Sequence, residues 1–177
     1  MAARKTKKPS KPAARKAAAP KPARGPREGS AAPDFDLPTD GTGRLSLKAL
    51  RGKAVVLYFY PRDDTPGCTR EACGFNDALP DFSKVKAEIV GVSKDKEASH
   101  ARFRAKYGLS FQLAADTELK AARAYGVWIE KSLYGRKYMG MDCATFLIDR
   151  DGVIRRVWRG VKVPGHVAEV LAAARNL

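Results

Sequence analysis

The sequence predicts an α/β fold with a mixed central sheet flanked by helices. Apolar runs at 54–60 and 87–93 have the pattern of strands buried on both faces, and helical segments alternate with them. Near the C-terminal end, the Asp151-Gly152 pair separates two more strand-like runs, which predicts a β-hairpin. Strands joined through helices and then a hairpin give a sheet with both parallel and antiparallel neighbours.

The remaining elements are expected in a regular order along the chain. They are an extended segment at 35–37 before a turn at 41–43, a short helix or turn at 45–50, helices at 66–79, 97–107, 118–125 and 164–175, a short strand at 111–115, and the hairpin strands at 144–148 and 153–158. Gly108 and Gly126 are well placed to end the two middle helices, because glycine adopts the left-handed conformation that often follows a helix.

Charge separates the chain into two parts. The formal net charge is +15, and residues 1–30 hold ten Lys or Arg against the single acid Glu28. This Lys/Ala/Pro-rich segment has no aromatic residue and no apolar period, so we expect a disordered basic tail at 1–30 and one folded domain at 31–177. The tail could be a solubilising arm, a weak non-specific contact for nucleic acid, or an organelle-targeting peptide.

Composition also bounds the compartment. Three cysteines are few and odd in number, which argues against a disulfide-built secreted protein. No stretch is apolar over the length that a membrane span needs, and the N-terminus lacks the apolar core of a secretory signal. We therefore expect a cytoplasmic protein that has no membrane partner.

The stretch DDTPGCTREACG places Cys68 and Cys73 five positions apart. Metal binding is disfavoured, because three Cys and two scattered His do not make the usual set of four ligands. A static disulfide is disfavoured too, since five helical residues turn roughly 500° and rise about 7.5 Å.

The residues before Cys68 favour chemistry. Thr65 suits the N-cap and Pro66 the first helical position, so Cys68 falls in the first turn, where free N–H groups stabilise an anion. Reactive thiolates occur at such places, and an inert buried cysteine is the competing interpretation. His100 is expected on the surface of its helix and His166 on the last helix, without a Cys/His catalytic pair. Trp128, Tyr138 and Trp158 are expected to pack.

Four segments carry a resemblance to a known family. They are YFYPRDDTPGCTREACGF at 58–75, YGRKYMG at 134–140, TFLIDRDG at 145–152 and VKVPGHVAEVL at 161–171. Together they resemble peroxiredoxins of the bacterioferritin-comigratory, or PrxQ, type from Ala31 to the C-terminus. The pattern Pro61, Thr65, Cys68 is highly specific, and the second cysteine five residues on is characteristic of this subgroup.

The resemblance implies a thioredoxin-like fold and an antioxidant thiol peroxidase, active on hydrogen peroxide and organic hydroperoxides without a cofactor. Cys68 would be oxidised to a sulfenic acid, and Cys73 would resolve it as an intramolecular disulfide that thioredoxin reduces. Thr65 would hydrogen-bond the sulfur or the peroxide, and Pro61 would shield the pocket. Resolution within one chain implies a monomer.

One position departs from the family. An arginine is expected three residues before Phe146, and this chain has Cys143 there. Arg123 and Arg136 are conceivable substitutes. Cys143 could be a small buried residue, a simple loss of the arginine, or a thiol that itself reacts. Two other functions stay open: a general thiol–disulfide oxidoreductase, and a nucleic-acid-associated protein acting through the tail.

Overall fold

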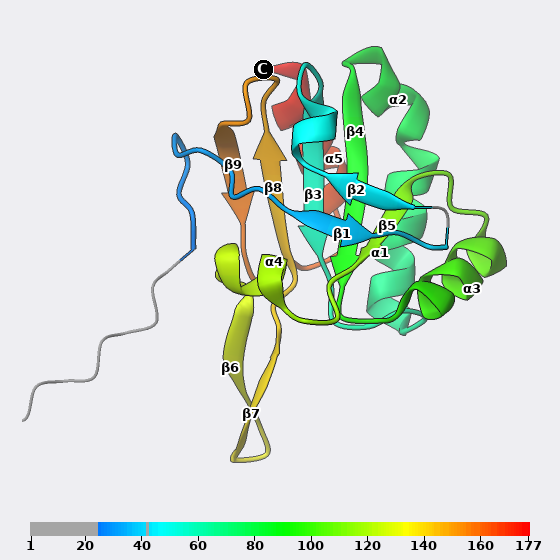
Figure 1. Cartoon of the computed structure of the whole chain (residues 1–177), viewed down its shortest axis with the longest axis vertical. Helices are drawn as coiled ribbons and strands as arrows, with labels where there is room; N and C mark the ends of the chain where they lie inside the picture. The colour runs from blue at the N-terminus through cyan, green and yellow to red at the C-terminus, as the bar shows by residue number, and fades with distance from the viewer. Residues whose placement is uncertain (1–24, 42) are drawn as a thin grey trace, which may run out of the picture.

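A five-stranded mixed sheet forms the centre of the molecule (Figure 1). The computed structural model describes residues 25–41 and 43–177; most of the expected basic tail lies outside the described residues, together with the roles considered for it. The strands are, in spatial order, β5 (Gln112–Ala115), β4 (Ala87–Ser93), β3 (Ala54–Phe59), β8 (Ala144–Ile148) and β9 (Ile154–Trp158). β3, β4 and β5 run parallel, whereas β8 and β9 are antiparallel to their neighbours, which confirms the expected mixed α/β sheet.

The central strand β3 separates two apolar cores. Its side chains alternate, so that Leu57 and Phe59 enter one core while Val56 and Tyr58 enter the other. All six residues of the strand are buried. A continuous apolar run is therefore explained by a strand that is covered on both faces.

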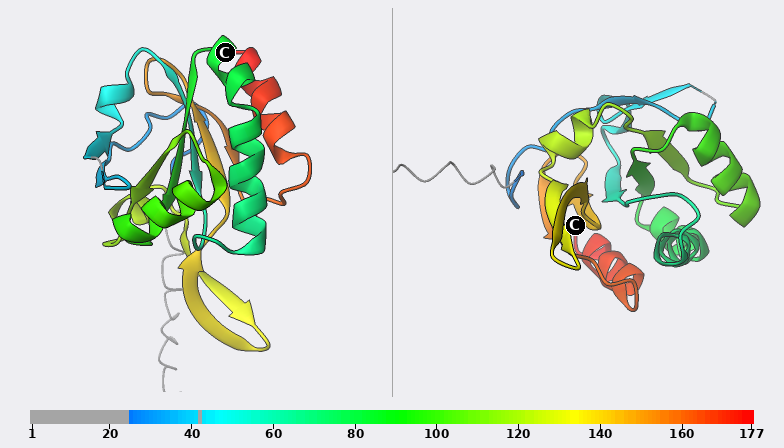
Figure 2. Two further views of the ribbon diagram at one scale, coloured as in Figure 1. Left: turned by 90° about the vertical axis from the view of Figure 1, so that its right-hand side faces the viewer. Right: turned by 90° about the horizontal axis from the view of Figure 1, so that it is seen from below.

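Helices and short strands cover these two faces (Figure 2). One face carries α1 (Pro66–Asp77), α2 (Leu79–Lys84) and α5 (His166–Arg175), and α3 (Glu97–Tyr107) adds Phe103 to the same core. The other face carries β1 (Asp36–Pro38), β2 (Arg44–Ser46), the short 3-10 helix η1 (Lys48–Leu50) and α4 (Lys120–Ala124). None of the described helices is both long enough and apolar enough to cross a lipid bilayer.

Two elements differ from the sequence-based expectation. The helix expected at 66–79 ends at Asp77, and the separate short helix α2 follows it. A hairpin of β6 (Trp128–Leu133) and β7 (Arg136–Met141) was not expected and projects from the body of the molecule (Figure 1). Tyr134 and Gly135 both have positive φ at its turn, and Tyr-Gly is a weaker hairpin signal than Asn-Gly or Asp-Gly.

Two side chains lie where the sequence did not place them. His100 was expected on the surface of its helix, but it is fully buried. Its ring lies against the loop that precedes α1, within hydrogen-bond distance of the Asp63 carboxylate. Tyr138 was expected to pack, but it lies on the projecting hairpin with 48% of its surface exposed. Trp128 and Trp158 are partly buried against the two cores, as expected.

Residues 28–30 cover the outer edge of β9. Gly29 N–H donates to the carbonyl of Ile154 at 2.7 Å, and Ile154 N–H donates to the carbonyl of Ser30 at 2.9 Å. The carboxylate of Glu28 accepts the N–H of Val157 at 3.1 Å. The last residues of the expected basic tail therefore pair with the sheet.

Candidate active site

The start of α1 is built by Thr65 and Pro66. Thr65 is extended, with φ −93° and ψ 153°, and Pro66 takes the first helical position. The Thr65 side chain makes no capping hydrogen bond; its hydroxyl donates to the carbonyl of Arg62 at 3.1 Å. Because the hydroxyl proton is directed to that carbonyl, the oxygen lone pairs can accept a hydrogen bond from another donor.

Cys68 is the third residue of α1 and is 8% exposed. It packs in the core that contains Tyr58 and Ala72, and its thiol forms no disulfide. The first-turn N–H groups of a helix lack intrahelical acceptors, and the helix dipole is positive at this end. The fold therefore places the sulfur where negative charge is stabilised and where solvent access is limited.

Cys73 lies on the same helix, half-buried and unbonded. Burial and the charge of Asp77 raise the pKa of its thiol. Helix α1 is continuous from Pro66 to Asp77, so the two sulfur atoms lie at different angles around its axis. A bond between them requires the first turns of α1 to unwind.

Glu71 places a carboxyl group one turn after Cys68, on the same side of α1. It is 2% exposed, and within the described part of the chain its Oε1 atom has no hydrogen-bond partner. Burial raises the pKa of Glu71 to about 7. Its carboxyl is therefore partly protonated at neutral pH, an unusual state for a glutamate.

His166 is the histidine closest to this carboxyl. Its Nε2 atom lies 4.0 Å from Glu71 Oε1 and 2.8 Å from the hydroxyl of Thr145 on β8. Burial lowers the pKa of His166, which the charge of Glu169 only partly opposes. The ring is thus neutral near pH 7 and does not supply a permanent positive charge.

Cys143 takes the position before β8 at which the family resemblance implies an arginine. Burial, together with the nearby charges of Glu71 and Cys68, raises the pKa of its thiol to about 11. The fold therefore brings Cys143 to the same cluster as Cys68 and keeps it protonated. Of the two proposed substitutes, Arg123 is exposed on α4 and Arg136 is exposed at the start of β7.

Tyr58 belongs to the same cluster, which the sequence did not indicate. The phenol is fully buried, and its oxygen has no hydrogen-bond partner among the described residues. Burial raises its pKa well above the usual value, and the charges of Glu71 and Cys68 add to the effect. Its strand position could be read from the sequence, but its proximity to α1 depends on how the helix packs on the sheet.

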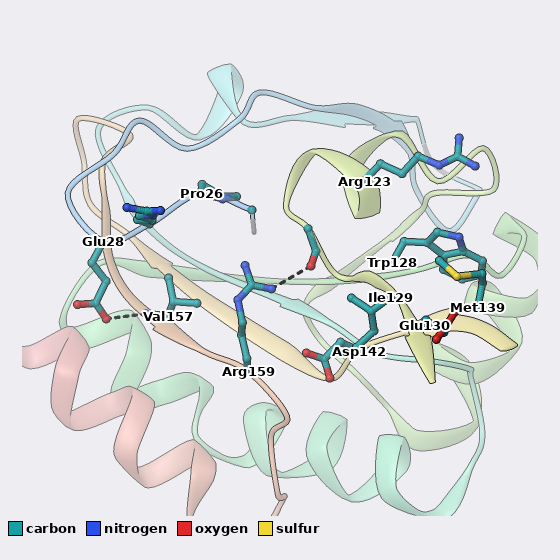
Figure 3. A pocket seen from close by; sticks show the side chains of 13 residues that line it. Pro26, Glu28, Arg123, Trp128, Ile129, Glu130, Met139, Asp142, Val157 and Arg159 are labelled. Atoms are coloured by element: carbon teal, nitrogen blue, oxygen red, sulfur yellow. Dashed lines mark hydrogen bonds between the residues drawn. The ribbon is translucent and has the colours of Figure 1, made fainter. Parts of the chain in front are cut away.

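A wide groove lies elsewhere on the molecule (Figure 3). It encloses about 1180 Å³, and its lining includes Trp128, Ile129 and Met139 but none of the three cysteines. Arg159 crosses it and donates to the carbonyls of Tyr125 and Gly126 at 3.1 and 3.0 Å. Its guanidinium is therefore bound to backbone and does not replace the arginine that Cys143 lacks.

Comparison with known proteins gives the family. Residues 29–157 match the family model described as the AhpC/TSA family. The putative peroxiredoxin bcp of Coxiella burnetii is 52% identical over 143 residues, which cover 81% of this chain and 95% of that protein. The peroxiredoxin Bcp of Bacillus subtilis is 45% identical over 149 residues, covering 84% of this chain and 95% of its own.

Solved structures agree with this match. The peroxiredoxin Q of Xanthomonas campestris superposes with a TM-score of 0.77 at 43% identity, covering 80% of this chain and 90% of its own. A mutant PrxQ of Xylella fastidiosa gives a TM-score of 0.80 at 36% identity, covering 85% and 96%. The expected thioredoxin-like fold is thus confirmed, and the chain belongs to the AhpC/TSA family. Within that family it is a peroxiredoxin of the Bcp, or PrxQ, type, as the resemblance of its motifs implied.

Proposed function

We propose that this peroxiredoxin reduces hydrogen peroxide and organic hydroperoxides through Cys68 and is recycled through a Cys68–Cys73 disulfide. The observation that carries the proposal is the position of Cys68 in the first turn of α1. It follows the extended N-cap residue Thr65 and precedes a second thiol on the same helix by five residues. A Xanthomonas campestris relative with 42% identity has been described in connection with alkyl peroxide reduction activity, which supports the substrate class.

The first step oxidises Cys68. Its thiolate attacks the terminal oxygen of ROOH, and the O–O bond breaks. Cys68 becomes a sulfenic acid, and RO⁻ leaves. A proton then converts RO⁻ into ROH, or into water when the substrate is hydrogen peroxide. In this proposal the first-turn N–H groups stabilise the sulfur, Thr65 accepts a hydrogen bond from the peroxide O–H, and Pro61, half-buried beside the loop, limits water access.

The second step uses Cys73. Its thiolate attacks the Cys68 sulfenic sulfur, a disulfide forms, and hydroxide leaves and is protonated to water. Because α1 separates the two sulfur atoms, the helix must unwind locally before they can bond. Thioredoxin or a similar dithiol of a reducing compartment, such as the cytoplasm, returns both thiols to the reduced state. No second subunit is required, so we propose a monomer.

A thioredoxin-coupled peroxide assay tests the proposal. The wild type should consume both hydrogen peroxide and an alkyl hydroperoxide, and Cys68→Ser should abolish consumption. Cys73→Ser should allow one oxidation of Cys68 but no thioredoxin-dependent turnover. The matched control is Cys143→Ser, which should leave the disulfide pairing intact when the oxidised protein is mapped by mass spectrometry. Rapid insulin reduction without peroxide consumption would favour a general thiol–disulfide oxidoreductase instead.

A further inference from the structure

The loop from Pro61 to Thr65 is fastened to α3 by a buried carboxylate. Asp63 is 8% exposed, and its Oδ1 atom accepts the hydroxyl of Tyr60 at 2.6 Å. Its Oδ2 atom accepts the hydroxyl of Ser99 at 2.8 Å and lies 2.8 Å from Nδ1 of His100. Three side chains thus converge on one carboxylate in the middle of the motif that leads to Cys68.

Each ring nitrogen of His100 lies close to a polar group of the protein. Nε2 faces the carbonyl oxygen of Ala114 at 3.2 Å, and a carbonyl can only accept. Burial by itself raises the pKa of Asp63, but the hydrogen bonds from His100, Tyr60 and Ser99 outweigh it, so the pKa is lowered and the group is a carboxylate. Nδ1 of His100 lies against this carboxylate and 3.3 Å from the hydroxyl of Tyr60, while Nε2 lies against the carbonyl of Ala114. The ring therefore links the loop to α3 and β5.

Backbone contacts extend the same anchor. The N–H of Asp63 donates to Oδ2 of Asp95 at 2.8 Å, and the hydroxyl of Ser93 donates to that oxygen at 2.7 Å. The next residue, Asp64, has a positive φ of 58° and contacts Lys106 at 2.8 Å. The Lys106–Asp64 ion pair is exposed and contributes little. The hydroxyl of Tyr107 also donates to Asp64, at 2.5 Å. The buried contacts of the loop are those made by the side chain of Asp63.

The hydrogen bonds of Asp63 fix the loop before α1, but they do not fix the turns of α1 that must unwind. The bonds of Asp63 lie before Pro66, whereas the helical turns that separate Cys68 from Cys73 lie after it. We propose that Asp63 and His100 are positioning residues that keep the Pro61–Thr65 loop fixed while α1 unwinds and refolds. The inference rests on the peroxidase function proposed above. It assigns the pair to the oxidation step, in which Thr65 and Pro61 must face the substrate, and not to the resolution step.

Two near-isosteric variants separate positioning from simple structural support. In H100N the side-chain amide nitrogen takes the place of Nδ1 and can donate a hydrogen bond to Asp63. In H100Q the amide nitrogen takes the place of Nε2 and can donate to the carbonyl of Ala114, but the hydrogen bond to Asp63 is lost. Stopped-flow mixing gives the second-order rate constant for Cys68 oxidation and, separately, the first-order rate constant for disulfide formation. Glu97→Gln, exposed in the first turn of the same helix, is the matched control.

We expect H100Q to lower the oxidation rate constant by about tenfold or more, since small displacements of positioning groups have large kinetic effects. H100N should retain the rate within about threefold, and disulfide formation should change less than about threefold in both variants. Ser99→Ala removes one bond to the same carboxylate and gives a milder test if H100Q does not fold; it should lower oxidation alone.

Three results would overturn the inference. The first is equal oxidation rates in H100Q, S99A and the wild type, and the second is a parallel fall of both rate constants with the folded fraction, which circular dichroism measures. In either case an active wild type leaves the peroxidase function standing. The third is a reduced wild type that consumes no peroxide, which removes the proposed function together with the inference.

Discussion

Glu71 carries a buried carboxyl group one helical turn after Cys68. The arginine that the family resemblance implies at position 143 is absent, and Cys143 supplies no positive charge there. Without a cationic partner, ionisation of Glu71 is opposed by burial alone, and its pKa rises to about 7.

A first prediction concerns stability. The native state keeps the Glu71 proton up to about pH 7, while the unfolded chain loses it near its ordinary value of 4.5. The native state therefore binds more protons in this window, and stability falls as pH rises through it, by at most about 3 kcal/mol. Glu71→Gln removes this dependence, so its stability relative to the wild type should rise between pH 5 and pH 8. Urea unfolding at both pH values measures the difference, and parallel pH profiles would contradict it.

A second prediction concerns the missing guanidinium. Cys143→Arg should return a cationic donor next to Cys68, where charge develops on the departing oxygen, and should raise the rate of peroxide reduction by about tenfold or more. Cys143→Ser is the control and should leave the rate unchanged. Combining Cys143→Arg with Glu71→Gln reports whether the arginine also pairs with the carboxylate. A lower rate of peroxide reduction in Cys143→Arg would show that the surroundings of Cys68 accommodate a thiol at position 143 but not a guanidinium.

At the scale of elements, α1 must serve two purposes. In the reduced state its first turn stabilises Cys68 and its later turns pack Ala72 and Phe75 into the core. The disulfide then requires the turns between Cys68 and Cys73 to open, although the loop before Pro66 is fastened by buried hydrogen bonds. In the proposed reaction cycle we therefore expect α1 to stay fixed at its beginning and to open just after it.

Hydrogen exchange can detect this opening. Amides of residues 67–73 should exchange faster in the peroxide-oxidised protein than in the reduced protein, because the disulfide is incompatible with the continuous helix. Cys73→Ser, which cannot form the disulfide, should keep the slow exchange of the reduced helix. Equal protection in the oxidised and reduced wild type would exclude unwinding as the route to the disulfide.

In the whole molecule, we expect the outer edge of the sheet to influence whether copies of the chain associate. The outer side of β9 is covered by Glu28, Gly29 and Ser30 through backbone and carboxylate hydrogen bonds. An uncovered edge strand presents unpaired N–H and C=O groups to other chains. The segment just before the domain therefore protects the sheet against edge-to-edge pairing.

Two truncations test this protection. Deletion of residues 1–30 should expose the β9 edge and cause concentration-dependent self-association, whereas deletion of residues 1–24 retains the covering segment and should leave a monomer. Sedimentation velocity distinguishes the two. Identical behaviour of both truncations would show that the segment does not control association.

Structural features that depend on neighbouring residues could be predicted from the sequence. The buried strand at 54–60, the Asp-Gly hairpin and the start of α1 at Pro66 each follow from neighbouring residues, and so does the placement of Cys68 in a first helical turn. The motifs around Pro61, Thr65 and Cys68 also indicated the family. The environment of Cys68, in contrast, depends on how elements far apart in the sequence pack together. Glu71, Cys143 and His166 meet because α1 and α5 pack on the same face of the sheet next to β8. His100 is buried because α3 packs against the Pro61–Thr65 loop, where the ring contacts Asp63. A periodic sequence pattern does not indicate a contact between residues 37 positions apart.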